Sequence, residues 1–190
     1  LETITAKVNN GDITGLHKGV KKKSSRKNEF NFNVCNYLSA ILSTDASKIY
    51  GISDDTALIL YAETGGDLSS FKSDDNFVSW ASLAPNNRIS GGKIISSHLP
   101  KKKHPIKRAL LRAANSVYRS DNAFGDYYRK MRARLGPKGA KCALARKILI
   151  IYYHMITKKE PFNSKLLEQQ QKMNTQKRIL FLKKQLSKLE

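Results

Sequence analysis

The chain has 190 residues and carries 35 Lys and Arg against 15 Asp and Glu, which gives a formal net charge of +20. Apolar residues make up 40% of the chain, enough to form a core, so general disorder is excluded. No stretch reaches the roughly 20 uncharged apolar residues that a membrane span needs, and the first residues do not show the basic-then-apolar pattern of a signal peptide. Cys35 and Cys142 form no CxxC pair, which argues against a zinc site and a disulfide framework and favours a cytoplasmic protein.

The charge is segregated along the chain. Residues 88–147 hold 17 basic residues and two acids, whereas residues 45–75 hold seven acids and two bases. A concentrated positive field repels itself and is best tolerated when a polyanion is the partner, so the composition favours nucleic acid. A merely basic or ribosome-like protein is the alternative. A membrane surface is disfavoured, because the basic residues do not lie on one amphipathic helix.

The chain begins with a polar segment, residues 1–32, which we interpret as a linker or tail. Its end carries a basic cluster, Lys21, Lys22, Lys23, Arg26 and Lys27. From Val34 the apolar residues follow helical spacing, which predicts the first helix of the domain.

Two short helices are predicted next. Ser53 or Asp54 can cap a helix over residues 55–64, which Gly65 and Gly66 would end. Asp74 or Asp75 can cap a second helix. In that helix three apolar residues share a face and are expected in the core: Phe77, Trp80 and Leu83. Pro85 would stop it.

Residues 86–104 form a loop rich in Gly, Ser, Asn and Lys, with a possible short strand over residues 93–96. Pro105 fits the first turn of the next helix. That helix has one apolar stripe: Ile106, Ala109, Leu110, Ala113 and Val117.

Three further helices complete a mainly α, compact helical domain. Two are predicted over residues 122–135 and 139–157, separated by Gly136 and Pro137. The third lies in the charged tail, residues 163–190, whose apolar residues step by three and four as in a coiled coil. This seam consists of Ile179, Leu182, Leu186 and Leu189.

The segment APNNRISGGK, residues 84–93, is where chemistry is expected. Gly91 and Gly92 allow a backbone to approach a phosphate closely and expose amide donors. Arg88 and Lys93 could stabilise charge on a transferred phosphoryl group, and Ser90 could attack the phosphate to form a covalent intermediate. The alternative is a tight polar turn before a strand, since no base adjoins Ser90 in the sequence. The glycine spacing is not that of a Walker motif.

At this point the sequence resembles a known family. The stretch FVSWASLAPNNRISGGKIISS is similar to the signature of the insertion-sequence-110-type (DEDD) transposases, which move insertion elements in bacteria. The resemblance continues through RALLRAANSVYRS, DYYRKMRARLG and ARKILIIYYHMI. Upstream, YGISDDTALILYAETGGDLSSF resembles the helix-hairpin-helix-like start of the same domain. The likeness covers about residues 33–162, which we take as the carboxy-terminal transposase domain of the family.

The resemblance implies a two-part enzyme. An amino-terminal RuvC-like domain holds four acids that bind a divalent metal, Mg²⁺, and the carboxy-terminal domain supplies a serine nucleophile at the position of Ser90. An element-encoded RNA guides the choice of donor and target. This chain matches only the second part, so we expect a carboxy-terminal fragment or a truncated gene product, inactive alone. No metal ligands and no cofactor are assigned to it.

The resulting hypothesis is DNA binding and strand exchange of an insertion element, with Ser90 as the catalytic nucleophile. The expected partners are DNA, a guide RNA and further copies of the full-length protein, with no membrane. The alternative is a non-catalytic helical nucleic-acid-binding module in which Ser90 is structural. The expected phosphate-binding residues are Arg88, Gly91, Gly92, Lys93, Lys101, Lys102, Lys103, Lys107, Arg108 and Arg112.

Overall fold

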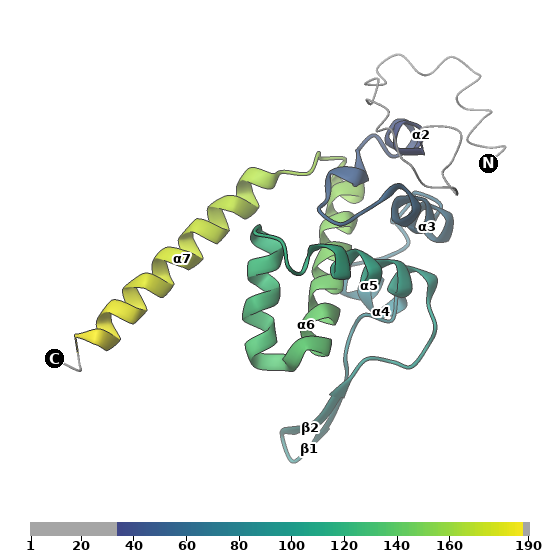
Figure 1. Cartoon of the computed structure of the whole chain (residues 1–190). Helices are drawn as coiled ribbons and strands as arrows, with labels where there is room; N and C mark the ends of the chain where they lie inside the picture. Colours follow the sequence, from purple (N-terminus) through teal and green to yellow (C-terminus); the bar gives the residue numbers. More distant parts are fainter. Residues whose placement is uncertain (1–33, 188–190) are drawn as a thin grey trace.

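The fold is mainly α, as the sequence predicts, and a computed structural model describes it for residues 34–187. In chain order, short helices precede a β-hairpin of two strands, after which come three longer helices (Figure 1). The proposed linker, residues 1–32, and the last seam residue, Leu189, lie outside the described residues. Within residues 34–187, no helix is both long and apolar enough to cross a membrane.

The amino-terminal helices lie close to the predicted positions, although the helix that Ser53 caps starts one residue earlier and a short 3₁₀ helix was not predicted. Helix α2 covers Val34–Leu42, and the short 3₁₀ helix η1 covers Ala46–Lys48. Helix α3, Asp54–Thr64, is capped by Ser53, whose hydroxyl accepts a hydrogen bond from the backbone N–H of Thr56. It ends at Gly65, whose φ of 68° lies in the left-handed region that glycine adopts without strain.

Helix α4, Asp74–Trp80, corrects two predictions. Its cap is Ser73, which accepts from the N–H of Asn76, and not Asp74 or Asp75. The two acids instead lie in the first turn, where the helix dipole favours negative charge. The helix ends before Pro85, because Ser82 has a φ of 59°, which cannot continue a helix.

Trp80 lies at the surface and not in the core. Its side chain is 37% exposed, whereas Phe77 and Leu83 are buried as expected. The indole stacks on the Phe77 ring with centroids 5.8 Å apart and meets the ring of His104 edge-on at 4.6 Å. It therefore covers the core from outside at the last residue of α4.

The two central helices supply most of the core. Helix α5, Pro105–Val117, begins with Pro105 in its first turn and buries the whole predicted apolar stripe. Helix α6, Ala123–Lys158, is bent at Gly136, whose φ of 71° and ψ of 175° are not helical. The predicted pair of helices is thus present as two limbs that fold back on each other (Figure 1). The second limb is buried at Leu144, Ile148, Leu149 and Tyr152.

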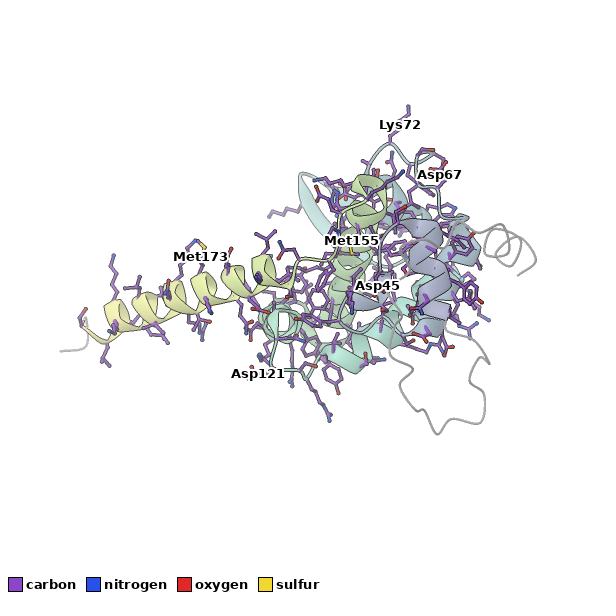
Figure 2. The ribbon with its side chains drawn as sticks, turned by 90° about the horizontal axis from the view of Figure 1, so that it is seen from above. Asp45, Asp67, Lys72, Asp121, Met155 and Met173 are labelled. Atoms are coloured by element: carbon purple, nitrogen blue, oxygen red, sulfur yellow. The ribbon has the colours of Figure 1, made fainter. Side chains whose placement is uncertain are left out.

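The carboxy-terminal helix α7, Ser164–Leu186, extends away from this body (Figures 1 and 2). Figure 2 shows the contrast between two methionines: Met155 lies within the body and Met173 on the projecting helix. Met155 is 5% exposed and Met173 is 55% exposed. The described seam residues, Ile179, Leu182 and Leu186, are likewise exposed, so this stripe does not fold back onto the core.

Candidate functional site

The predicted chemical loop is a β-hairpin. Strand β1 covers Asn86–Ser90, which the sequence left as loop, and β2 covers Lys93–His98, two residues longer than the predicted strand. The strands pair antiparallel, and the register places Ser90 opposite Lys93. Gly91 and Gly92 form the two-residue turn with φ of 54° and 74°. Positive φ at both central residues is characteristic of the type I′ hairpin turn. The glycines are therefore needed for the turn itself, whatever ligand they approach.

The hairpin brings Ser90 and its two nearest cations to one face. Side chains alternate along a strand, so Arg88 and Ser90 share a face of β1, and Lys93 joins them as the strand partner of Ser90. Every residue of β1 is exposed, and so is Lys93. Within the described part of the chain, no ion pair involves Arg88 or Lys93. This face is free to contact an anion.

The Ser90 hydroxyl is not hydrogen-bonded to a base in the described part of the chain. Within residues 34–187 this hydroxyl forms no hydrogen bond and no acid lies between Asn86 and His104 in the sequence. A serine needs a neighbouring base or another activating group to become a strong nucleophile. The hairpin therefore supplies an accessible hydroxyl and positive charge.

The lysine triplet lies at the opposite end of the hairpin from Ser90. Lys101, Lys102 and Lys103 are exposed and follow β2 beyond the pair Asn86 and His98. The four residue steps of β1 span roughly 13 Å. Arg88 and Lys93, near the turn, and the triplet, beyond the base of the hairpin, are thus two separate groups of cations.

The base of the hairpin is fastened to the body by α5. Lys107 donates a hydrogen bond of 2.6 Å from its Nζ to the carbonyl of Pro100, so this predicted phosphate ligand is partly committed to the fold. Arg108 and Arg112 are exposed on α5. His104 is buried and caps α5, because its Nδ1 accepts from the N–H of Ile106 at 3.3 Å. Burial lowers the pKa of His104, which favours the neutral acceptor form.

Two acidic residues of α4 contact basic side chains of α6. Asp75 accepts from Arg146 at 2.7 Å, and Asp74 lies 3.5 Å from the Nε2 of His154, so both tie α4 to α6. No group of three His, Cys, Asp or Glu within the described residues could hold a metal ion. These residues do not fit the divalent metal that the resemblance implies for a RuvC-like domain.

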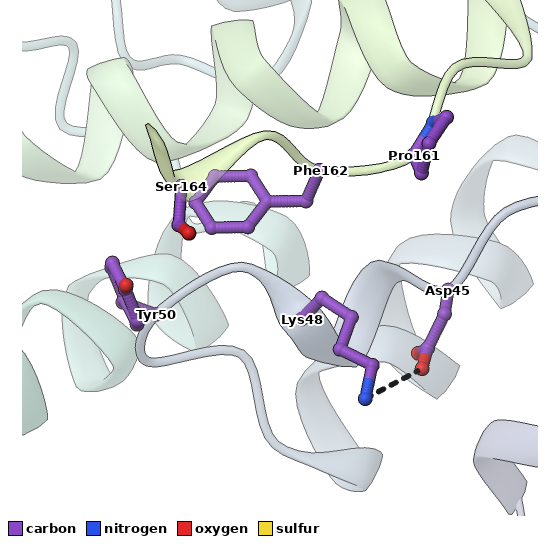
Figure 3. A pocket seen from close by; sticks show the side chains of 6 residues that line it. All are labelled: Asp45, Lys48, Tyr50, Pro161, Phe162 and Ser164. Atoms are coloured by element: carbon purple, nitrogen blue, oxygen red, sulfur yellow. Dashed lines mark ion pairs between the residues drawn. The ribbon is translucent and has the colours of Figure 1, made fainter. Parts of the chain in front are cut away.

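A shallow pocket lies elsewhere, where the segment between α6 and α7 passes η1 (Figure 3). Its lining includes Tyr50 and Phe162, whose ring centroids are 5.5 Å apart, and the ion pair between Lys48 and Asp45 at 3.9 Å. Figure 1 shows η1 and the β-hairpin at opposite ends of the body. None of the predicted site residues lines this pocket.

Comparison with known proteins supports the family resemblance. Residues 44–129, which include the β-hairpin and α5, match the family model described as Transposase IS116/IS110/IS902 family. The chain is also 34% identical over 94 residues to the Insertion element IS110 uncharacterized 43.6 kDa protein of Streptomyces coelicolor. That alignment covers 49% of this chain and 23% of the relative, so the chain spans less than a quarter of that protein's length.

Proposed function

We propose that this chain is part of an insertion-element DNA transposase, in which it binds DNA and exchanges strands through Ser90. One observation carries the proposal. The segment that is similar to transposases projects a hairpin from the body, and near its turn an accessible hydroxyl lies between two cations that form no ion pair within residues 34–187. Cations placed where charge develops on a phosphoryl group stabilise its transition state.

In the proposed reaction the Oγ of Ser90 attacks the phosphorus of a DNA phosphodiester. The Ser–O–P bond forms as the bond from phosphorus to a sugar oxygen breaks, and the departing DNA hydroxyl takes up a proton. The serine proton passes to a base outside the described residues. A hydroxyl of the partner strand then attacks the phosphoserine, which releases Ser90 and joins the new strands. Because the bond energy is kept in the phosphoserine, no nucleotide triphosphate is consumed.

The proposal includes a second domain of RuvC-like type, a guide RNA and more than one copy of the full-length protein. Ser90 is not hydrogen-bonded to a base within residues 34–187, which supports a RuvC-like domain that activates its hydroxyl. The domain boundaries that we propose are residues 33–162 for the transposase domain and 163–190 for the tail.

The test compares two serine variants in the full-length protein with its RNA. Ser90→Ala should abolish strand transfer and should leave folding and DNA binding unchanged, since exposed substitutions usually alter stability by no more than about 0.5 kcal/mol. Ser96→Ala, on the same hairpin, is the matched control and should keep wild-type activity. Normal strand transfer by Ser90→Ala would refute the catalytic assignment.

The second candidate function is a non-catalytic nucleic-acid-binding module. The two glycines favour this candidate, because the backbone geometry of the turn accounts for Gly91 and Gly92 without any ligand. A covalent protein–DNA adduct, trapped on a nicked DNA substrate and mapped to Ser90, separates the two functions. The binding module forms no such adduct.

A further inference from the structure

Two large apolar side chains are exposed on the hairpin. Ile89 is 65% exposed and Ile95 is 70% exposed. A two-stranded hairpin has no apolar core of its own and is only marginally stable in water. Apolar side chains that remain in water here give up the favourable free energy of burial. Sequence reasoning singled out only the polar residues of this segment and missed both isoleucines.

Ile89 adjoins Ser90 on β1, and Ile95 follows Ile94, the strand partner of Ile89, on β2. Ile89 precedes Ser90 on β1, so alternation directs the two side chains to opposite faces. The register pairs Arg88 with Ser96 and Ile89 with Ile94, so Ile95 is an extra residue that forms a β-bulge. A bulge redirects a side chain and increases the local twist of the strand. The end of the hairpin thus combines a cationic face with apolar groups next to it.

The charge of this segment indicates the kind of partner. Residues 86–104 contain five Lys and Arg and no Asp or Glu. A surface that is apolar and only cationic is complementary to a polyanion with an apolar interior, which is what the phosphates and stacked bases of a duplex provide. A two-stranded ribbon fits a groove of DNA, and isoleucine is among the side chains that wedge between base steps.

We propose that Ile89 and Ile95 form an apolar wedge that enters duplex DNA next to the phosphate contacted by Ser90 and unstacks a base step there. The choice of DNA as the partner rests on the proposed function. Unstacking bends the backbone and widens access to the phosphodiester, while the β-branched side chains lose little rotamer freedom on insertion. Arg88 and Lys93 hold the adjacent phosphates.

The test measures binding of the purified chain to two duplexes of about 30 base pairs with the same arbitrary sequence. One is fully paired, and the other carries a central two-base mismatch that is already unstacked. A wedge costs less free energy to insert at the mismatch, so wild type should bind that duplex roughly tenfold more tightly. The double variant Ile89→Ser, Ile95→Ser should lose this preference and keep the salt dependence of binding. Leu135→Ser, which changes a side chain that is 54% exposed on α6, is the matched control.

Each outcome decides the proposal. Loss of the mismatch preference in the isoleucine variant alone, with a circular dichroism melting curve like that of wild type, supports the wedge. An equal preference in wild type and the isoleucine variant overturns it, as does a change in self-association in place of DNA binding. Ser90→Ala should keep the mismatch preference, so a failed wedge and a failed nucleophile are distinguished. If wild type binds neither duplex, the wedge and the DNA-binding function are both overturned.

Discussion

Around the hairpin, single residues serve the fold and the proposed chemistry together. Gly91 and Gly92 supply the positive φ of the turn, and the turn holds Ser90 next to Lys93. Lys107 holds the carbonyl of Pro100, and His104 begins α5 where the hairpin segment returns to the body. The position of Ser90 therefore depends on residues that never need to contact a ligand.

His104 makes stability depend on pH. Burial lowers the pKa of its imidazole, Glu63 opposes this effect, and Lys102 adds to it. A base with a lowered folded-state pKa contributes stability above its unfolded pKa of about 6.5, and this stability is lost as the pH falls through the folded-state value. Protonation also removes the Nδ1 acceptor that caps α5, a contribution of about 1 kcal/mol.

We therefore expect His104→Asn, which keeps a capping oxygen but does not titrate, to lose less stability than wild type between pH 7.5 and pH 5. Thermal unfolding at both values measures the difference, and other titrating groups cancel in the comparison. Trp80, the only tryptophan of the chain, contacts the His104 ring and reports the same titration by fluorescence. Parallel pH dependence of the two proteins would contradict the prediction.

At the scale of elements, the bend of α6 depends on one backbone position. Gly136 has a φ of 71° and a ψ of 175°, a region that essentially only glycine occupies. The bend lets the second limb return along the first, so that the Nζ of Lys147 lies 4.5 Å from the centroid of the Tyr127 ring. Burial and the nearby Lys130 lower the pKa of Lys147.

Gly136→Ala should destabilise the chain by about 1 to 3 kcal/mol, the usual cost of forcing such backbone geometry. A Cβ at this position would meet no atom within 4 Å, so the cost is conformational and not a clash. Lys138→Ala, an exposed change in the same bend, should alter stability by no more than about 0.5 kcal/mol. Urea unfolding of the three proteins measures both effects, and equal stability of Gly136→Ala and wild type would disprove the argument.

Local signals predict the helices well, because residues that cap or break a helix act over one turn. Gly65, Pro105 and Gly136 all mark helix boundaries or breaks at the expected places. Strand β1 was not predicted, because an exposed hairpin has no buried face and its sequence, NNRIS, shows no apolar alternation. The paired glycines between two short polar stretches were the available signal for a hairpin.

The position of Trp80 shows a second limit of prediction from the sequence. Its spacing from Phe77 puts both on one helical face, but α4 ends at Trp80 and only Phe77 enters the core. For the site, the sequence predicts the residue types and their neighbours along the chain. It does not predict that Lys101 lies at the far end of the hairpin from Ser90, since that separation follows from strand pairing.

At the scale of the whole molecule, the segregated charge is only partly neutralised by the fold. Asp75 pairs with Arg146, and Arg129 pairs with both Asp121 and Asp126. Such exposed pairs contribute little stability, with a median of about 0 to 1 kcal/mol. The cations of the hairpin are in no ion pair within the described residues, so the positive field there remains available to a polyanion.

Helix α7 extends an unusual apolar surface into solvent. Its outer half exposes five large apolar side chains by 47% or more: Ile179, Leu180, Phe181, Leu182 and Leu186. Exposed apolar groups gathered in this way indicate an interaction surface. Between Ser164 and Leu186 the helix also carries six Lys and Arg against Glu168 alone, and this like charge opposes close pairing of two copies.

We therefore expect weak self-association through α7 that strengthens when RNA screens the charge. A chain that ends at Asn163 should remain monomeric with and without RNA. It should melt only slightly below the intact chain, because the deletion removes Leu167, which packs against the core, while the outer half of α7 is exposed. Leu182→Glu should weaken association, whereas Gln176→Glu makes the same charge change at an exposed polar position of the same helix and should have little effect. Sedimentation velocity of these proteins decides the matter. Identical species from the intact and shortened chains in every condition would show that α7 is not an association element.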